Sequence, residues 1–177
     1  MSNRIILDRK ITDDHWRLIE TGEAVDANGD IIVPLALWLD QRAQLTARSG
    51  RNGVWLAPGD EPRLLAADTG ILPLIALRFP QFADGRGYSS ARLLRQRYGF
   101  AGELRAIGEV LRDQLFYLER VGFNAFAIKP GKSIEDALDG FGDFSDAYQA
   151  SAMQPAPLYQ RRLQSQDQAG LASVAAP

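Results

Sequence analysis

The sequence contains no cysteine and only one histidine among its 177 residues. Without cysteine the chain can form no disulfide, no thiolate nucleophile and no iron–sulfur or cysteine-ligated zinc centre. The single histidine, His15, excludes a multi-histidine metal site, so only hard cations held by carboxylates remain available. His15 stands beside Trp16 without a serine or cysteine motif, which indicates a packing or surface residue. We therefore expect no metal centre and no cofactor.

Excess positive charge and long apolar runs are also missing. The formal net charge is -2 and the isoelectric point is near 5.4, so no general basic field attracts nucleic acid or an anionic membrane. The N-terminus has no apolar run typical of a signal peptide, and no segment approaches the roughly 20 apolar residues of a membrane span. We expect a cytoplasmic protein with no nucleic-acid or membrane partner.

The hydrophobic content of 46% is sufficient for one sizeable core. We predict a single domain over residues 1–149. Beyond it the composition turns to alanine, glutamine, serine and proline, which predicts a flexible tail over residues 150–177. The segment PLYQRRL within this tail is, alternatively, a docking segment.

Residues 74–129 read as strand, helix, strand, helix, strand. The strands are expected in LPLIALRFP, GELRAIG and NAFAIK, with helices running to Tyr98 and over residues 109–122. This alternation predicts a parallel βαβαβα sheet or a partial-barrel-like single α/β domain. A helix over residues 35–48, the strand GVWLAP and a last helix capped by Ser133 complete the prediction.

Short extended pieces precede this repeat. RIILD, HWRLIE and DIIVP are separated by turn-prone residues, which predicts a small N-terminal β cap outside the repeat. In the helix ending at Tyr98, Arg92 and Arg95 are expected on a solvated face.

Ligands of parallel α/β sheets bind at the carboxyl ends of strands, where charged residues collect in this chain. In the loop QFADGRGYSS, Gly87 permits close backbone approach and Ser89 or Ser90 can cap the helix that follows. An anion could sit there beside Arg86, with Asp84 as candidate acid or base. Alternatively, the glycines only shape a turn and Asp84 pairs with Arg86.

Two further features lie at the ends of the predicted strands. Lys129 ends the third strand and is a candidate anion ligand. The loop also partly matches a dinucleotide fingerprint, but Ser90 replaces the third glycine and the loop is longer than the tight turn of that fold.

Arg105 interrupts an otherwise small and apolar strand. A buried guanidinium needs a carboxylate or a ligand anion. The candidate carboxylates are Asp84, Glu103, Glu109 and Asp113. An internal ion pair and a ligand-facing arginine are both compatible with the pattern.

The helix over residues 109–122 breaks simple patterning twice. Gln114 falls within the apolar face, and Phe116 lies among polar residues on the opposite face. Gln114 is therefore either a ligand contact or a hydrogen-bond partner of nearby backbone. Phe116 is either covered by the N-terminal strands or part of a partner or homodimer surface.

The motif FADGRGYSSARLLRQRYGFAGELRAIGEVLRDQL, followed by RVGFNAF, resembles the bacterial domain of unknown function 934 family. The resemblance covers about residues 54–130. It implies a gene neighbourhood with assimilatory sulfite reductase and a role in sulfite reduction, for which members are often labelled accessory oxidoreductases.

Two functions from different classes follow. The first is an accessory protein of sulfite reduction and sulfur assimilation that binds a reductase subunit. The alternative is a small oxyanion-binding protein or enzyme of the same pathway, with Arg86, Arg105 and Lys129 as anion ligands. The absence of a nucleophile, a metal-ligand set or a complete cofactor motif favours the first.

Overall fold

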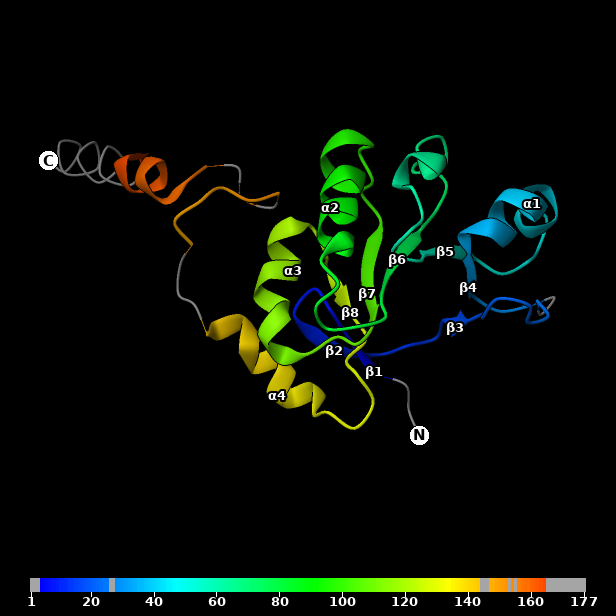
Figure 1. Cartoon of the computed structure of the whole chain (residues 1–177), viewed down its shortest axis with the longest axis horizontal. Coiled ribbons are helices and arrows are strands. Elements are labelled where there is room, and N and C mark those ends of the chain that lie inside the picture. Colours follow the sequence, from blue (N-terminus) through cyan, green and yellow to red (C-terminus); the bar gives the residue numbers. More distant parts are fainter. Residues whose placement is uncertain (1–3, 26–27, 144–146, 153, 155, 165–177) are drawn as a thin grey trace, which may run out of the picture.

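The computed structural model describes residues 4–25, 28–143, 147–152, 154 and 156–164. These residues build one eight-stranded sheet in the order β2-β1-β8-β7-β6-β5-β4-β3, which curls into a half-barrel (Figure 1). The strands are β1 (Arg4–Leu7), β2 (Lys10–Asp13), β3 (Arg17–Leu18), β4 (Ile31–Pro34), β5 (Asn52–Leu56), β6 (Leu74–Phe79), β7 (Glu103–Gly108) and β8 (Ala125–Phe126).

The sheet is mixed. Strands β3 to β8 lie side by side in chain order and are parallel, as the strand and helix alternation predicts. Strand β1 pairs antiparallel with both β8 and β2. The prediction of a purely parallel sheet is therefore wrong, and so is that of a separate N-terminal cap. Each short N-terminal strand pairs into the sheet, because otherwise the edges of β4 and β8 would leave backbone groups unpaired.

The curl follows from a short connection. Strands β2 and β3 are the two edges of the sheet, yet only Asp14, His15 and Trp16 join them. In a flat sheet of this size the edges would lie about 33 Å apart at the usual strand spacing. The connection spans at most about 14 Å from Asp13 to Arg17. The sheet must therefore bend until its edges approach each other.

Helices cover the convex face of the half-barrel (Figure 1). They are α1 (Leu35–Thr46), the 3-10 turn η1 (Pro62–Leu65), α2 (Arg86–Arg92), the π-helical turn η2 (Leu93–Arg97), the 3-10 turn η3 (Arg112–Gln114), α3 (Leu115–Val121), α4 (Ile134–Asp139) and the 3-10 turn η4 (Gly140–Gly142). Ser133 caps α4 as predicted, because its Oγ accepts the Asp136 N–H at 3.1 Å. The other predicted cap is wrong: α2 begins at Arg86, so Ser89 and Ser90 lie inside the helix.

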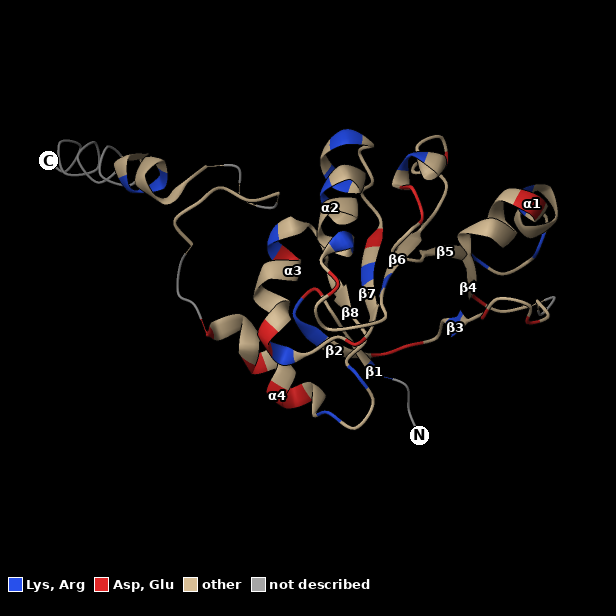
Figure 2. Ribbon diagram, in the orientation of Figure 1, with Lys and Arg blue, Asp and Glu red and all other residues tan. Residues whose placement is uncertain are grey.

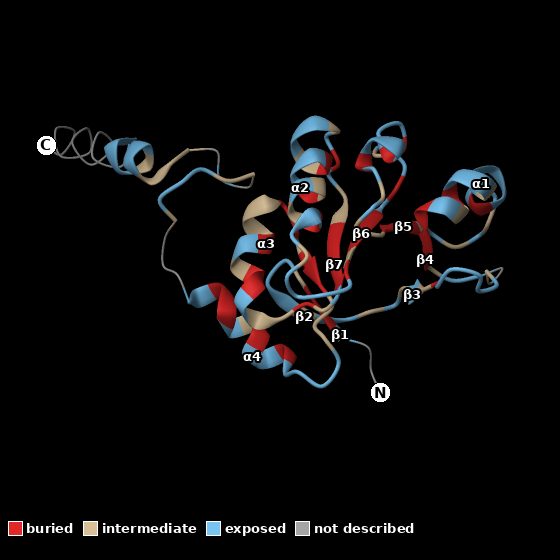
Figure 3. Cartoon of the chain, viewed as in Figure 1, coloured by how far each residue is buried: buried red, intermediate tan, exposed pale blue. Residues whose placement is uncertain are grey.

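Each face of the sheet has its own apolar core, because side chains alternate along a strand. In β6, Ile75 and Leu77 belong to the large convex core under the helices, whereas Leu74 and Ala76 belong to a smaller concave core. The buried members of the concave core are Ile32, Trp55, Leu74, Ala76 and Ile107. Figure 3 shows buried residues along the central strands and the inward sides of the helices. Burial of each large apolar side chain contributes roughly 1.5–3 kcal/mol, so these two layers stabilise the curl.

The predicted tail is partly described. Residues 158–164 are helical, and residues 165–177 lie outside the described part of the chain. Within the described ranges, no helix has the length and apolar character that crossing a membrane requires.

Candidate functional site

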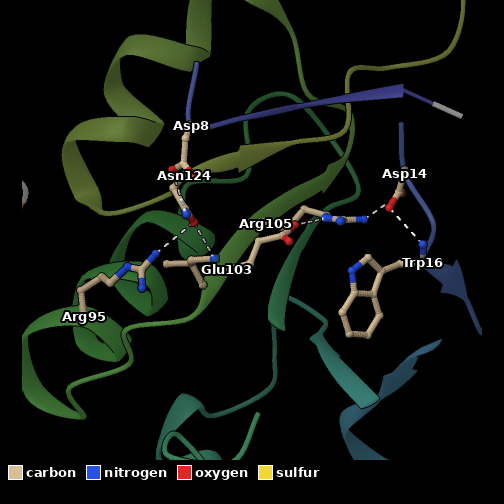
Figure 4. A network of polar contacts seen from close by, with 8 residues as sticks. Asp8, Asp14, Trp16, Arg95, Glu103, Arg105 and Asn124 are labelled. Carbon is tan, nitrogen blue, oxygen red and sulfur yellow. Dashed lines mark hydrogen bonds and ion pairs between the residues drawn. The ribbon is translucent and has the colours of Figure 1, made fainter. Parts of the chain in front are cut away.

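Arg105 is 2% exposed on the concave face of β7 and is paired with two carboxylates. Its Nε donates to Glu103 Oε1 at 2.7 Å, and its Nη1 donates to Asp14 Oδ2 at 2.8 Å (Figure 4). Glu103 was among the expected partners. Asp14 was not, because it comes from the connection that crosses from β2 to β3. The remaining terminal nitrogen, Nη2, is buried without a hydrogen-bond partner among the described residues.

This cluster holds two mostly buried carboxylates against one guanidinium. Burial raises the pKa of Glu103 above its ordinary value, although Arg105 lowers it, and the negative charges of Asp14 and Asp8 raise it further. The pKa of Arg51 is raised mainly by its hydrogen bond to Asp30. The nearby charge of Glu103 raises it further. The two carboxylates thus balance the charge of Arg105 within the chain, although its Nη2 has no hydrogen-bond partner among the described residues, and the cluster as a whole is rich in negative charge.

Asp84 and Arg86 form a local fork in the loop after β6. The Nε and Nη2 of Arg86 donate to the two carboxylate oxygens of Asp84 at 2.9 and 2.7 Å, and the Arg86 N–H donates to Oδ1 at 3.1 Å. The Arg86 hydrogen bond lowers the pKa of Asp84. A carboxylate with a lowered pKa is a weak general base at neutral pH. The loop therefore shows the pairing that was the alternative to an anion site.

Gly87 is explained by packing inside α2. A Cβ atom at this position would lie 2.5 Å from Cζ of Phe79, which belongs to the convex core. Glycine lets the first turn of α2 rest on that ring. Ser89, the predicted ligand two residues later, lies inside the helix and does not cap it.

Gln114 uses its side chain to hold two backbone groups. Its Oε1 accepts the Leu111 N–H at 2.9 Å, and its Nε2 donates to Phe82 O at 3.2 Å. Because Phe82 belongs to the loop after β6, Gln114 ties that loop to the start of α3. The predicted long helix over residues 109–122 instead begins with the 3-10 turn η3 and continues as α3 from Leu115.

Phe116 is half-buried on α3 rather than fully outward. Its ring contacts Tyr117 edge-on, with the centroids 5.3 Å apart, and the Arg120 guanidinium lies 5.6 Å from its centroid. Its neighbour Tyr117 is exposed. Phe116, Tyr117 and Arg120 thus form one cluster on the outer side of α3.

Lys129 lies beyond β8 and pairs with Glu109, which follows β7. Their Nζ and Oε2 atoms are 2.5 Å apart, and both side chains are more than one-third exposed. The pair joins the C-terminal ends of two neighbouring parallel strands, where ligands of such sheets bind.

Sequence reasoning missed Arg78, Trp55 and Glu20, which meet at the same end of the sheet. The Arg78 guanidinium lies 4.0 Å from the Trp55 ring centroid and forms two hydrogen bonds with Glu20. The signal was present: Arg78 interrupts the apolar strand β6 as Arg105 interrupts β7.

Arg95 was predicted on a solvated face, and that prediction is wrong. It donates from Nε to Gly122 O at 2.8 Å, from Nη1 to Phe100 O at 2.6 Å and Gly102 O at 2.8 Å, and from Nη2 to Asn124 Oδ1 at 3.1 Å. Burial lowers its pKa. Asn124 also bonds the backbone of β7, because its Oδ1 accepts the Leu104 N–H at 2.8 Å (Figure 4). Arg95 therefore fastens the π-helical turn to the loops before β7 and β8, where carbonyls otherwise lack donors.

A pocket of about 220 Å³ opens beyond the ends of β7 and β8. Its lining includes Arg112, which pairs with Asp136 and Asp143. The volume is below the roughly 300 Å³ at which small-molecule sites begin. Within the described ranges, no group of three or more histidine or acidic side chains is placed to hold a metal ion.

Comparison with known proteins gives one family match. A model for the family described as "Bacterial protein of unknown function (DUF934)" matches residues 53–159. No curated protein and no solved structure matches the chain. The family match spans the sheet from β5 onward and reaches into the helix at residues 158–164.

Proposed function

Because the chain belongs to the bacterial DUF934 family of unknown function, and its central motif resembles members encoded beside sulfite reductase, we propose that it is an accessory protein of assimilatory sulfite reduction. It acts by binding a component of the reductase. The resemblance supports the pathway in this proposal, and the exposed surface of the molecule supports the mode of action.

The observation that carries the proposal is the helix at residues 158–164. Tyr159 and Leu163, four positions apart and so on one helix face, are both exposed. Figures 1 and 3 show this helix lying away from the half-barrel with its surface exposed. An amphipathic helix that leaves Tyr159 and Leu163 exposed suits a groove on a partner.

This segment is attached to α3. The Ala152 N–H donates to Arg120 O at 2.9 Å, and Arg120 Nη2 donates to Gln149 O at 2.8 Å. Tyr148, beside Gln149, is exposed. We propose that this segment and the exposed Tyr117 of α3 together make up the docking patch, because tyrosine is among the residue types that dominate binding energy at protein interfaces.

Charge favours an acidic partner surface. Residues 147–164 include Arg161 and Arg162 and no aspartate or glutamate, so the described part of this segment is basic (Figure 2). An acidic groove on the reductase would speed association and select this orientation.

The interior of the site supports binding over catalysis. Asp84, Arg105 and Lys129 each pair with a charged group of the same chain. Their pairing accounts for their charges without a substrate. No redox group or nucleophile is needed for a docking role.

Co-purification tests the docking surface. Tagged wild-type chain should capture sulfite reductase from cells grown on sulfate, and a Tyr159→Ala, Leu163→Ala double variant should lose most of it. Leu64→Ala with Ile71→Ala is the matched control, because these residues are exposed apolar side chains at η1 and after it. Equal capture by both double variants would contradict this surface.

Growth tests the pathway separately. A deletion strain should grow poorly with sulfate as sole sulfur source and normally with cysteine. Normal growth on sulfate would exclude the role in sulfite reduction. A homodimer is the second expected partner of the patch, and light scattering on the purified chain measures it directly.

A further inference from the structure

Arg78 is held in a fixed position on the concave side of the sheet. Its Cζ lies 4.0 Å from the centroid of the Trp55 ring, which belongs to the concave core. The guanidinium side chain is 25% exposed, so one side rests on the indole and its edge remains within reach of solvent. The cation–π contact and the packing remove most of its rotational freedom.

The partner of Arg78 is held much less firmly. Glu20 follows β3 and accepts both hydrogen bonds, from Nη1 at 2.9 Å and from Nη2 at 2.6 Å. Its side chain is 55% exposed. The backbone around it is a turn in which the Glu23 N–H donates to Glu20 O at 3.0 Å. Release of this carboxylate would return it to water at little cost, because an ion pair with an exposed member contributes little to stability.

The other arginine pairs differ in this respect. The partners of Arg105 are buried, so displacing either would leave an unpaired charge inside the protein. Arg86 is largely exposed and its partner Asp84 is mostly buried, within the same turn. Only at Arg78, among these three, is the cation the fixed member and the carboxylate the exposed one.

The position is also the expected one for a ligand. Arg78 is the penultimate residue of β6, and the Glu109–Lys129 pair follows β7 and β8 at the same C-terminal end of the parallel strands. Ligands of α/β sheets and barrels bind at this end.

We propose that Arg78, fixed on Trp55, anchors a binding site for a small oxyanion, and that Glu20 is the internal competitor which the oxyanion displaces. The fork of a guanidinium binds two oxygens of one group, so the ligand class is a small carboxylate or a small inorganic oxyanion, among which the sulfur oxyanions are those of the proposed pathway. Glu20 marks the positions of those two oxygens. The inference is independent of the docking surface proposed above.

Substitutions of Glu20 and of Arg78 should change the affinity for these anions in opposite directions. Binding of sulfite, sulfate and acetate to the purified full-length chain is measured by calorimetry at constant ionic strength, with tryptophan fluorescence as a second readout. Glu20→Gln should tighten binding roughly fivefold, because the competing ion pair is gone. Arg78→Lys should weaken it at least about tenfold, because the fork is lost while the charge remains.

Asp84→Asn is the matched control, since it breaks an arginine–carboxylate fork in the neighbouring loop. It should leave affinity unchanged, as should the Tyr159→Ala, Leu163→Ala double variant. Preferential binding of acetate assigns a carboxylate ligand, and preferential binding of sulfite or sulfate assigns a sulfur oxyanion.

Three results would overturn the site. The first is that neither wild type nor Glu20→Gln binds any of these anions. The second is that these two proteins bind with equal affinity. The third is that Asp84→Asn tightens binding as much as Glu20→Gln does. Circular dichroism establishes that each variant folds. If Arg78→Lys does not fold, the comparison of Glu20→Gln with Asp84→Asn still decides the question.

Discussion

Asp14 and Arg105 are 91 positions apart in the sequence, yet Oδ2 of Asp14 lies 2.8 Å from Nη1 of Arg105. Asp14 also accepts the Trp16 N–H at 3.1 Å. The contact joins the connection between the two sheet edges to the middle of the concave face, so it holds the half-barrel in its curled form.

Asp14→Ala should therefore destabilise the fold by about 2–3 kcal/mol, since it leaves a buried donor of Arg105 unsatisfied. Urea unfolding followed by circular dichroism measures the loss. Asp84→Ala, which breaks the fork with exposed Arg86, should cost clearly less than Asp14→Ala. Equal losses in the two variants would show that the buried pair has no special role.

The raised pKa of Glu103 makes the stability of the fold depend on pH. Its folded pKa is raised, so between the ordinary glutamate value and the raised value the folded chain binds more protons than the unfolded chain. The stability contributed by this group is fully present below the ordinary value and is lost as pH rises through the folded pKa. Relative to Glu103→Gln, wild type should lose stability as the pH rises above the ordinary glutamate pKa of about 4.3. Denaturation midpoints across this range test it, and parallel curves would contradict it.

Gly122 ends α3 with φ of +117°, and a Cβ there would lie 2.4 Å from Cγ of Arg95. Gly122→Ala combines an unfavourable backbone conformation with displacement of Arg95 from its carbonyls. We expect a loss of about 3 kcal/mol. Gly131 has φ of +83° with nothing near its Cβ position, so Gly131→Ala should cost about 1 kcal/mol. Thermal unfolding of the two variants separates the cost of backbone strain, which both share, from the cost of the collision with Arg95, which only Gly122→Ala has.

Gln114→Ala should cost about 2 kcal/mol, because the Leu111 N–H and Phe82 O both lose their partner. Gln96→Ala is the comparison, since Gln96 is exposed and bonds only Arg92 in the described structure. Its change should lie within about 0.5 kcal/mol. If Gln114→Ala left stability unaltered but weakened anion binding, Gln114 would be a ligand contact instead.

The sequence predicted the parts of the fold that local patterns control. The apolar strands β5, β6 and β7 and the Ser133 cap follow from runs and motifs within a few residues. The pairing of β1 with β8 does not, because paired residues such as Ile6 and Phe126 lie about 120 positions apart and antiparallel pairing there leaves no local signature.

The candidate site shows the same division between residues that local patterns reveal and contacts that only the folded chain brings together. The sequence identified Arg105 as a residue in need of a partner, because a charge in an apolar strand is costly wherever the partner lies. It could not identify Asp14, which only the crossing from β2 to β3 brings near. Arg95 was misjudged because its acceptors are backbone carbonyls, which every residue carries and no pattern distinguishes.

The antiparallel pairing of β1 with β8 has a consequence for synthesis on the ribosome. Asp8, next to β1, and Asn124, next to β8, are hydrogen-bonded across 116 positions. The β1–β2 hairpin emerges first, but the strand that covers its edge emerges only after β7 and α3. Until then an unpaired strand edge is open to other chains. We expect aggregation of nascent chains truncated before β8 to exceed that of chains truncated after α4.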